Sequence, residues 1–205
     1  MCVRVMGKPM KRPGLLVVVF VGSLLTFITF NTIVTDSEGS KGLEAGDTLP
    51  PFAMPLSSSP CEGRCDANVA TAAGQGAAGA RPACEVRGPE VLNVCELREQ
   101  GPFVLAFVFH PVERCRDQLP ALERVAARHP DVQFRVVAVR ANAADARGLR
   151  SGLPVGYDHD GAVANEYAVV VCPTITYVKR GGEVAGSTVG VQSEAQLEEW
   201  VRRVE

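Results

Sequence analysis

The apolar residues in the second half of the chain fall into blocks that predict strands and helices in alternation. Residues 103–109 (FVLAFVF) form an almost unbroken run of branched and aromatic side chains, which is typical of a strand buried on both faces. Residues 113–128 place Leu119 and Leu122 on one helical face, and residues 132–141 return to strand composition. This order of strand, helix and strand predicts two parallel strands joined by a right-handed crossover.

Patterns on either side of this unit predict the rest of an α/β fold. A glycine pair separates two strand-like runs near the carboxyl end, as is typical of a tight turn. The chain then ends in an amphipathic run that predicts a helix. The further predicted elements are helices at residues 144–149, 162–167 and 193–204, strands at 91–96, 175–178 and 183–187, and turns at 98–101, 157–161 and 181–182.

An apolar run near the amino end predicts a membrane anchor. Residues 14–34 carry no charge over 21 positions, which is long enough to cross the hydrocarbon core of a bilayer as a helix. Residues 1–13 hold four basic and no acidic side chains, so we expect them in the cytoplasm and the remaining chain outside it. A cleaved signal peptide is the alternative, but residues 31–35 have no small-x-small cleavage pattern. We therefore predict a single-pass membrane protein with an uncleaved anchor.

Composition narrows the classes of function. With 205 residues, of which 46% are hydrophobic, the chain has room for one domain with a sizeable core and some extra segments. The four basic residues before the anchor leave the rest of the chain with a net charge of −6. A nucleic-acid partner needs a basic face, and none is visible, so we expect no nucleic-acid binding.

Two segments that lie far apart in the sequence resemble parts of one known fold family. Residues 102–120 combine the buried strand, a short turn, Cys115 at the start of the helix and Pro120 five residues later. Residues 167–174 (YAVVVCPT) end in a proline followed by threonine. These segments resemble the redox-active turn and the cis-proline loop of the thioredoxin fold. The chain is similar to the membrane-anchored thiol–disulfide reductases and redoxins of that family.

The resemblance implies a domain organisation. Residues 48–205 are expected to form an α/β thioredoxin-like domain, a central mixed sheet flanked by helices, with residues 35–47 as a tether to the anchor. Residues 46–56 are similar to the proline-bearing start of redoxin domains, which contributes an early hairpin. An insertion at about residues 57–87 departs from the family. Its middle, residues 68–81, is a low-complexity stretch of small residues that predicts a mobile segment.

The chain also departs from the family at the redox turn itself. Cys115 matches the second cysteine of the family's Cys-x-x-Cys motif and Pro120 matches its helix-kinking proline, but Val112 stands in place of the first cysteine. The resemblance implies that Cys172, which precedes the cis-proline Pro173, is a neighbour of Cys115. An alternative redox pair is therefore expected.

Seven cysteines divide according to the predicted topology. Cys2 is expected in the cytoplasm as a free thiol, which leaves six cysteines, an even number, in an oxidising compartment. Among Cys61, Cys65, Cys84 and Cys95 three pairings are possible. We favour structural disulfides that join Cys84 to Cys95 across a hairpin with a Gly-Pro turn, and Cys61 to Cys65. A zinc site is the alternative, but the spacings are not those of a zinc ribbon, and we expect no metal.

The candidate site residues follow from these observations. Cys115, at a helix start and beside two arginines, has its thiolate form favoured, and we predict that it exchanges with Cys172. The cis geometry that the resemblance implies for Pro173 is expected to position the Val171–Cys172 backbone for β-type pairing with an extended peptide. His110, just before the redox turn, is a candidate base for Cys115.

These residues predict an extracytoplasmic, membrane-tethered thiol–disulfide oxidoreductase with a non-standard cysteine pair. Its substrate would be a protein thiol or disulfide, and no cofactor is needed. A static disulfide, and two unpaired cysteines in a fold that has lost its enzyme activity, remain alternatives, and a peroxidase using Cys115 alone ranks third. If the pair is inert, the alternative function is a catalytically inactive thioredoxin-like envelope protein that binds a partner.

Overall fold

The computed structural model describes residues 20–26, 41–60 and 65–205. The chain divides into two units at residue 38, and in the first of them residues 20–26 are helical. Most of the predicted anchor and half of the predicted tether lie outside the described residues, as do Cys2 and Cys61. Within the described ranges, no helix is both long and apolar enough to cross a membrane.

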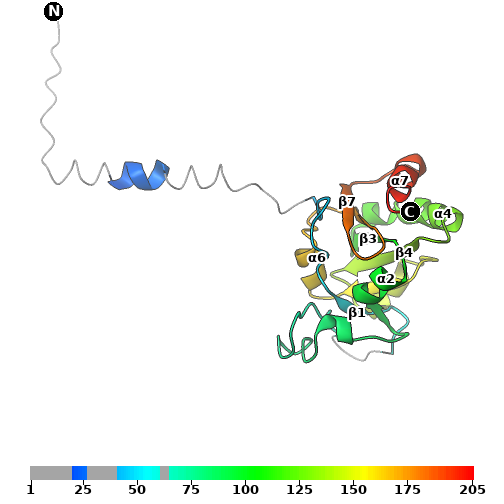
Figure 1. Cartoon of the computed structure of the whole chain (residues 1–205), viewed down its shortest axis with the longest axis horizontal. Helices are drawn as coiled ribbons and strands as arrows, with labels where there is room; N and C mark the ends of the chain where they lie inside the picture. The colour runs from blue at the N-terminus through cyan, green and yellow to red at the C-terminus, as the bar shows by residue number, and fades with distance from the viewer. Residues whose placement is uncertain (1–19, 27–40, 61–64) are drawn as a thin grey trace, which may run out of the picture. The chain divides into compact units, whose positions relative to one another are not determined.

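A five-stranded mixed sheet forms the centre of the second unit (Figure 1). Its strands in spatial order are β5 (Val155–Asp158), β4 (Gln133–Val139), β3 (Phe103–Phe109), β6 (Thr174–Val178) and β7 (Val184–Val189). The β3–β4 and β4–β5 pairs are parallel, whereas β6 is antiparallel to both β3 and β7. The predicted α/β class, the mixed sheet and the parallel crossover are confirmed.

Strand β3 lies in the middle of the sheet and is covered on both faces, as its composition predicts. Val104, Ala106 and Val108 belong to one apolar cluster, whereas Phe103 and Phe107 belong to the other. Helices α3 (Glu113–Arg116), α4 (Leu119–Arg128), α5 (Ala143–Gly148) and α7 (Glu194–Val201) contribute to the first cluster. Helices α2 (Val94–Gln100) and α6 (Ala162–Glu166) and the small antiparallel sheet of β1 (Ala53–Pro55) and β2 (Val91–Asn93) contribute to the second.

The helix predicted at residues 113–128 is wrong in one respect, because it is interrupted at Asp117 and Gln118. Pro120 is the second residue of α4. Its ring would clash with the carbonyl four residues earlier, and it has no N–H to donate, so a continuous helix cannot pass through this position. The interruption separates the short helix that carries Cys115 from the longer α4.

Two other predicted elements differ from the structure. The strand predicted at residues 91–96 ends at Asn93, because the Asn93 side chain accepts hydrogen bonds from Cys95 N and Glu96 N and starts α2. The predicted turn at residues 157–161 begins too early, since β5 runs to Asp158. The predicted early hairpin is not formed as such, because residues 46–56 contribute the single strand β1, which pairs antiparallel with β2 across the whole insertion.

The low-complexity middle of the insertion is held to the domain at its two ends, and the mobility of its centre stays a prediction. The backbones of Asn68 and Ala53 exchange two hydrogen bonds of 2.8 Å, and the Asn68 side chain donates to Arg81 O. Ala67, Asn68 and Ala70 are buried, whereas residues 71–78 are exposed. Asn68 and Gln75, whose Oε1 accepts from Thr71 N, thus give this segment polar contacts that its small side chains lack.

Candidate redox site

The topology brings Cys115 and Cys172 together although 57 positions separate them. Cys115 lies in α3, directly after β3, and Cys172 lies in the loop before β6. Because β3 and β6 are antiparallel neighbours, with Phe107 opposite Thr174, the end of one strand meets the start of the other. The two cysteines form a disulfide with a Cα–Cα distance of 5.4 Å.

The two sulfur-bearing residues differ in access to solvent. Cys115 is 0% exposed and packs in the apolar cluster with Leu119 and Leu122. Cys172 is only partly buried, at the edge of the same cluster. The backbone N–H of Phe109 lies 3.2 Å from Cys172 Sγ and donates to it. A thiolate on Cys172 would therefore keep a hydrogen-bond donor, which stabilises negative charge on sulfur.

The loop around Pro173 is held by two hydrogen bonds, and within the described ranges some of its backbone groups remain unpaired. The Cys172–Pro173 peptide bond is cis, as predicted, and Pro173 is buried. Gly190 N donates to Pro173 O (2.8 Å), and Thr174 Oγ1 donates to Val171 O (2.6 Å). Within the described part of the chain, the Val171 N–H and the Cys172 carbonyl make no hydrogen bond, so both can pair with an added strand.

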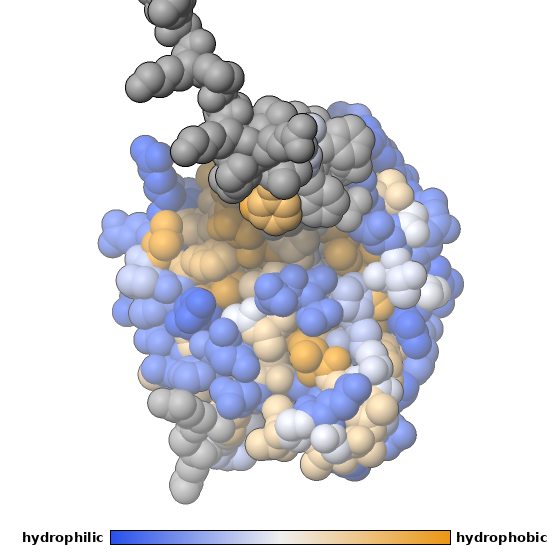
Figure 2. All heavy atoms as spheres, turned by 90° about the vertical axis from the view of Figure 1, so that its left-hand side faces the viewer, coloured by the Kyte–Doolittle hydropathy of each residue, from blue (hydrophilic) through white to orange (hydrophobic). Residues whose placement is uncertain are grey.

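Exposed apolar side chains border the disulfide. In residues 41–60 and 65–205 the exposed large apolar residues are Val112, Val170, Val171, Val189 and Val191, which we call the valine rim. Val170 and Val171 directly precede Cys172, and Val112 lies three residues before Cys115. The other two valines flank Gly190, whose N–H donates a hydrogen bond to Pro173 O. Figure 2 shows the side of the domain on which α6 lies in Figure 1, and apolar residues are exposed there between hydrophilic ones. Grouped apolar exposure of this kind is typical of a contact surface.

His110 lies beside the redox turn, but its contact is not with either sulfur. Its Nε2 is 3.6 Å from Asp145 Oδ1 in α5, and the His110–Pro111 peptide bond is cis. The pair lines a cavity of about 320 Å³ between the redox turn and α5, together with Arg116, which donates to Gly148 O. The nearest charged partner of His110 is thus in α5, and its role as a base for Cys115 stays a prediction.

Comparisons with known proteins address the fold. Neither a protein-family model nor a curated protein matches the sequence. Among solved structures, a protein assigned as the thiol:disulfide interchange protein DsbE of Chlorobium tepidum aligns over 79% of this chain and 98% of its own, at 19% identity and a TM-score of 0.58. The domain has a thioredoxin-like fold.

Two further solved structures align over a similar share of this chain. A protein assigned as a protein disulfide isomerase of Bacteroides thetaiotaomicron covers 80% of this chain and 91% of its own, at 15% identity and a TM-score of 0.57. A DsbF homologue of Corynebacterium diphtheriae covers 82% of this chain and 96% of its own, at 12% identity and a TM-score of 0.57. At these identities the likeness concerns the thioredoxin-like fold alone.

Cys84 and Cys95 belong to the apolar cluster on the other face of the sheet, whereas Cys65 packs against the same cluster as Cys115. Cys84 and Cys95 are joined by a disulfide, but not across a hairpin, because Cys84 lies in a 3-10 helix (Ala83–Glu85) and Cys95 in α2. Cys65 is also disulfide-bonded. Its predicted partner Cys61 lies outside the described residues, so that pairing stays a prediction. In the described ranges, no group of three or more histidine, cysteine or acidic residues is placed to hold a metal ion.

The resemblance implies a shielded Cys115, since the family's second cysteine is usually more shielded than the first, and the i, i+4, i+7 spacing of Cys115, Leu119 and Leu122 agrees with it. Sequence reasoning missed the burial of Asp158, a carboxyl group at the end of β5, because it depends on tertiary packing. Asp158 is 0% exposed and accepts hydrogen bonds from Val163 N and Ala164 N of α6. Burial raises the pKa of Asp158 to about 6.

Proposed function

We propose that this chain is a membrane-tethered thiol–disulfide oxidoreductase that acts outside the cytoplasm, with Cys115 and Cys172 as its redox-active pair. The observation that carries the proposal is the Cys115–Cys172 disulfide itself, which joins one buried sulfur to one partly exposed sulfur inside the valine rim. The position that holds the first cysteine in the resembling family is occupied by Val112, which is exposed. The surface sulfur is therefore supplied by the loop before Pro173 instead.

Access to solvent sets the order of the exchange. A substrate thiolate attacks Cys172 Sγ, the Cys115–Cys172 bond breaks, and Cys115 leaves as a thiolate that takes up a proton. The substrate's second thiolate then attacks the substrate sulfur of the mixed disulfide and releases Cys172. Two electrons pass from the substrate dithiol to the protein disulfide, and the two protons lost by the substrate balance those gained by the protein. The same steps in reverse reduce a substrate disulfide, and no cofactor takes part.

The surroundings of Cys172 favour a polypeptide substrate. The Val171 N–H and the Cys172 carbonyl are free to pair with an extended segment, as described above. The valine rim would bury apolar side chains of that segment, which excludes water from the exchanging sulfurs. The Phe109 N–H would stabilise the Cys172 thiolate when the mixed disulfide breaks.

The tether and the location rest on the sequence. Residues 14–34 supply an apolar span of membrane length, and the basic residues before it orient the domain outward. An oxidising compartment also suits a domain whose described cysteines, Cys65, Cys84, Cys95, Cys115 and Cys172, are all disulfide-bonded.

Thiol trapping with mass mapping, performed on the full chain across a series of redox buffers, tests the proposal. We expect the Cys115–Cys172 bond to open at a potential of roughly −120 to −270 mV, the range of exchange proteins. In a matched pair of variants, the Cys172 thiolate of Cys115→Ser should attack a peptide that contains a disulfide and remain trapped as a mixed disulfide, with the second peptide cysteine released as a thiolate, whereas Cys172→Ser should form no such adduct. If the bond resists reduction until the domain unfolds, exchange by this pair is excluded and a non-catalytic, partner-binding thioredoxin-like protein replaces it.

A further inference from the structure

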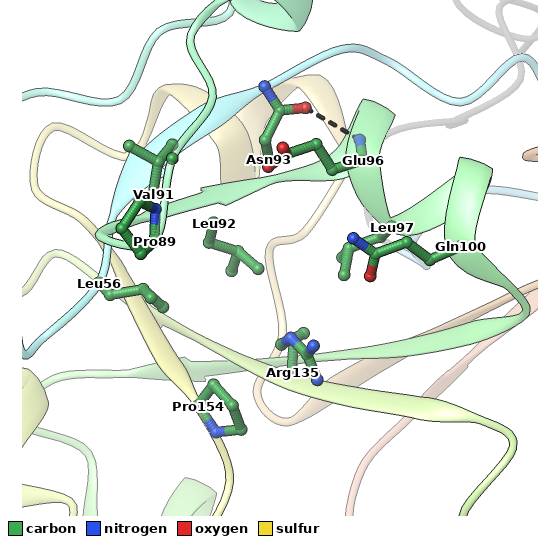
Figure 3. Close-up of a pocket in the computed structure, with 11 residues that line it drawn as sticks. Leu56, Pro89, Val91, Leu92, Asn93, Glu96, Leu97, Gln100, Arg135 and Pro154 are labelled. Atoms are coloured by element: carbon green, nitrogen blue, oxygen red, sulfur yellow. Dashed lines mark hydrogen bonds between the residues drawn. The ribbon is translucent and has the colours of Figure 1, made fainter.

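A second cavity lies away from the disulfide, toward the amino end of β4. Its volume is about 450 Å³, within the range of small-molecule sites. Its apolar lining includes Leu56, Leu92, Leu97 and Pro154, and its charged lining consists of Arg135 and Glu96 (Figure 3). Cys115 instead follows the carboxyl end of β3, which runs parallel to β4, so the two sites are separate.

Arg135 is the unusual member of this lining. It is partly buried on β4, and its guanidinium donates to two neutral acceptors, Phe134 O (2.9 Å) and Gln133 Oε1 (3.2 Å). Three of its five N–H groups have no acceptor within the described residues, and no described carboxylate lies within ion-pair distance. Burial lowers the pKa of Arg135, which is the effect of removing a charge from water without a countercharge.

We propose that this cavity binds a small ligand with an apolar body and one carboxylate, which Arg135 holds. A carboxylate would offset the desolvation of the guanidinium and accept the unused N–H groups in the paired geometry that arginine offers. The leucine and proline side chains would cover the apolar body.

The position of Glu96 limits the ligand to a single carboxylate. Figure 3 shows Glu96 beside Asn93, with Leu92 and Leu97 between it and Arg135. A second carboxylate at that end would face the Glu96 carboxylate and be repelled. The cavity is thus cationic at one end and anionic at the other.

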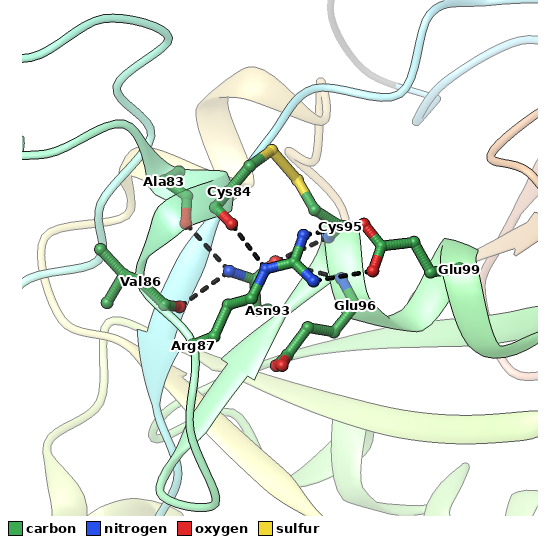
Figure 4. A network of polar contacts seen from close by, with 8 residues as sticks. All are labelled: Ala83, Cys84, Val86, Arg87, Asn93, Cys95, Glu96 and Glu99. Carbon is green, nitrogen blue, oxygen red and sulfur yellow. Dashed lines mark hydrogen bonds and ion pairs between the residues drawn. A yellow bond between two sulfur atoms is a disulfide. The ribbon is translucent and has the colours of Figure 1, made fainter.

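One wall of the cavity is held in place before any ligand arrives. The loop that supplies Gly88 and Pro89 is tied to α2 by the Cys84–Cys95 disulfide and by two hydrogen bonds of 2.7 Å between Arg87 and Glu99 (Figure 4). The Asn93 amide also donates to Ala83 O and Val86 O. A preformed wall lowers the ordering cost of binding.

Isothermal titration calorimetry of the full chain with 3-phenylpropionate tests this proposal, and 3-phenylpropanamide serves as its uncharged counterpart. We expect the acid to bind at least about tenfold more tightly than the amide, and Arg135→Gln to remove that difference. Arg135→Lys should retain much of the preference, because it keeps the charge. Arg202→Gln removes the same charge from an exposed position outside the cavity and should change nothing.

The source of the carboxylate is distinguished by a third probe. Tighter binding of N-acetylphenylalanine than of 3-phenylpropionate would identify the carboxyl end of a peptide as the ligand, and the reverse order would identify a free carboxylic acid. Phenylsuccinate, which carries a second carboxylate, should bind more weakly than either. Equal affinity of the wild type and Arg135→Gln for 3-phenylpropionate, or no binding at millimolar probe, would overturn the proposal.

Discussion

Replacement of Asp158 by asparagine should change how the stability of the domain depends on pH. Asp158 ends β5 with its side chain fully buried, and it accepts hydrogen bonds from the first turn of α6. Burial is the main reason that its pKa is raised from 3.8 to about 6, since an ionised carboxylate loses its hydration there. The two N–H donors lower this pKa, but not enough to cancel the effect of burial.

The expected magnitude follows from the shift. Each unit of pKa difference between the folded and unfolded states corresponds to about 1.4 kcal/mol, so a rise from 3.8 to about 6 corresponds to about 3 kcal/mol. The folded carboxyl group keeps its proton to a higher pH than the unfolded one. Its stabilising contribution is therefore complete below about pH 3.8 and is lost as the pH rises through about 6. The amide of the Asp158→Asn variant cannot titrate, so that variant shows no such loss.

The assay is urea unfolding between pH 4 and 7, roughly the interval of this titration. Unfolding is followed by the fluorescence of Trp200, the single tryptophan of the chain. Trp200 stacks on Tyr177 with ring centroids 5.2 Å apart, so its emission reports on the domain and not on the amino-terminal segment. The difference in unfolding free energy between wild type and Asp158→Asn should change by about 2.4 kcal/mol over this interval, slightly less than the full shift because pH 4 already lies above the unfolded pKa. Glu166→Gln, an exposed change in the same helix α6, should leave the wild-type profile unaltered. Parallel pH profiles for wild type and Asp158→Asn would refute the reasoning.

Two further substitutions test the packing and the valine rim. Gly156→Ala would place a Cβ 2.6 Å from Met54 Sδ and 2.8 Å from Leu92 Cδ2. We therefore expect thermal unfolding to show a destabilisation of about 1–3 kcal/mol. An unchanged melting temperature would contradict this close contact. Val171→Ser should slow exchange with an apolar cysteine peptide about tenfold, measured by stopped-flow, because it replaces an apolar contact of the valine rim by a hydroxyl group and adds no charge beside Cys172. The redox potential of the Cys115–Cys172 bond should stay as in the wild type, and a shifted potential with an unchanged rate would argue against a docking role.

The parts of the fold that the sequence predicts well are those in which one strong pattern acts alone. The run at β3 is apolar at every position, and a strand buried on both faces is the simple consequence. Strand β5 was not predicted, because it is four residues long and contains Gly156, whose small size is required by Met54 and Leu92 and not by the backbone. The strand predicted at residues 91–96 ends at Asn93, because the Asn93 side chain accepts hydrogen bonds from the first N–H groups of α2. Strand composition does not show this competition between a side chain and the sheet for backbone hydrogen bonds.

The candidate site could be predicted only in part, because some of its features depend on how distant segments pack together. The proximity of Cys115 and Cys172 followed from the resemblance, which supplies the order of strands in the sheet. The partial exposure of Cys172 and the Phe109 N–H at its sulfur depend on the relative placement of β3 and the loop before β6, which no local pattern encodes. The valine rim consists of residues that are ordinary in sequence and become a group only when three loops meet.

The distance along the chain between the two cysteines has a consequence for the lifetime of the protein. A Cys-x-x-Cys pair closes a loop of two residues within one helix turn, whereas the Cys115–Cys172 bond closes a loop of 57 positions across the central sheet. By loop-closure entropy a bond of this span stabilises the folded state by about 4 kcal/mol. Electron transfer through this pair would therefore loosen and retighten the domain in every cycle. The reduced protein would be the form that proteases degrade first, so that the redox poise of the compartment would also govern how much of the protein persists.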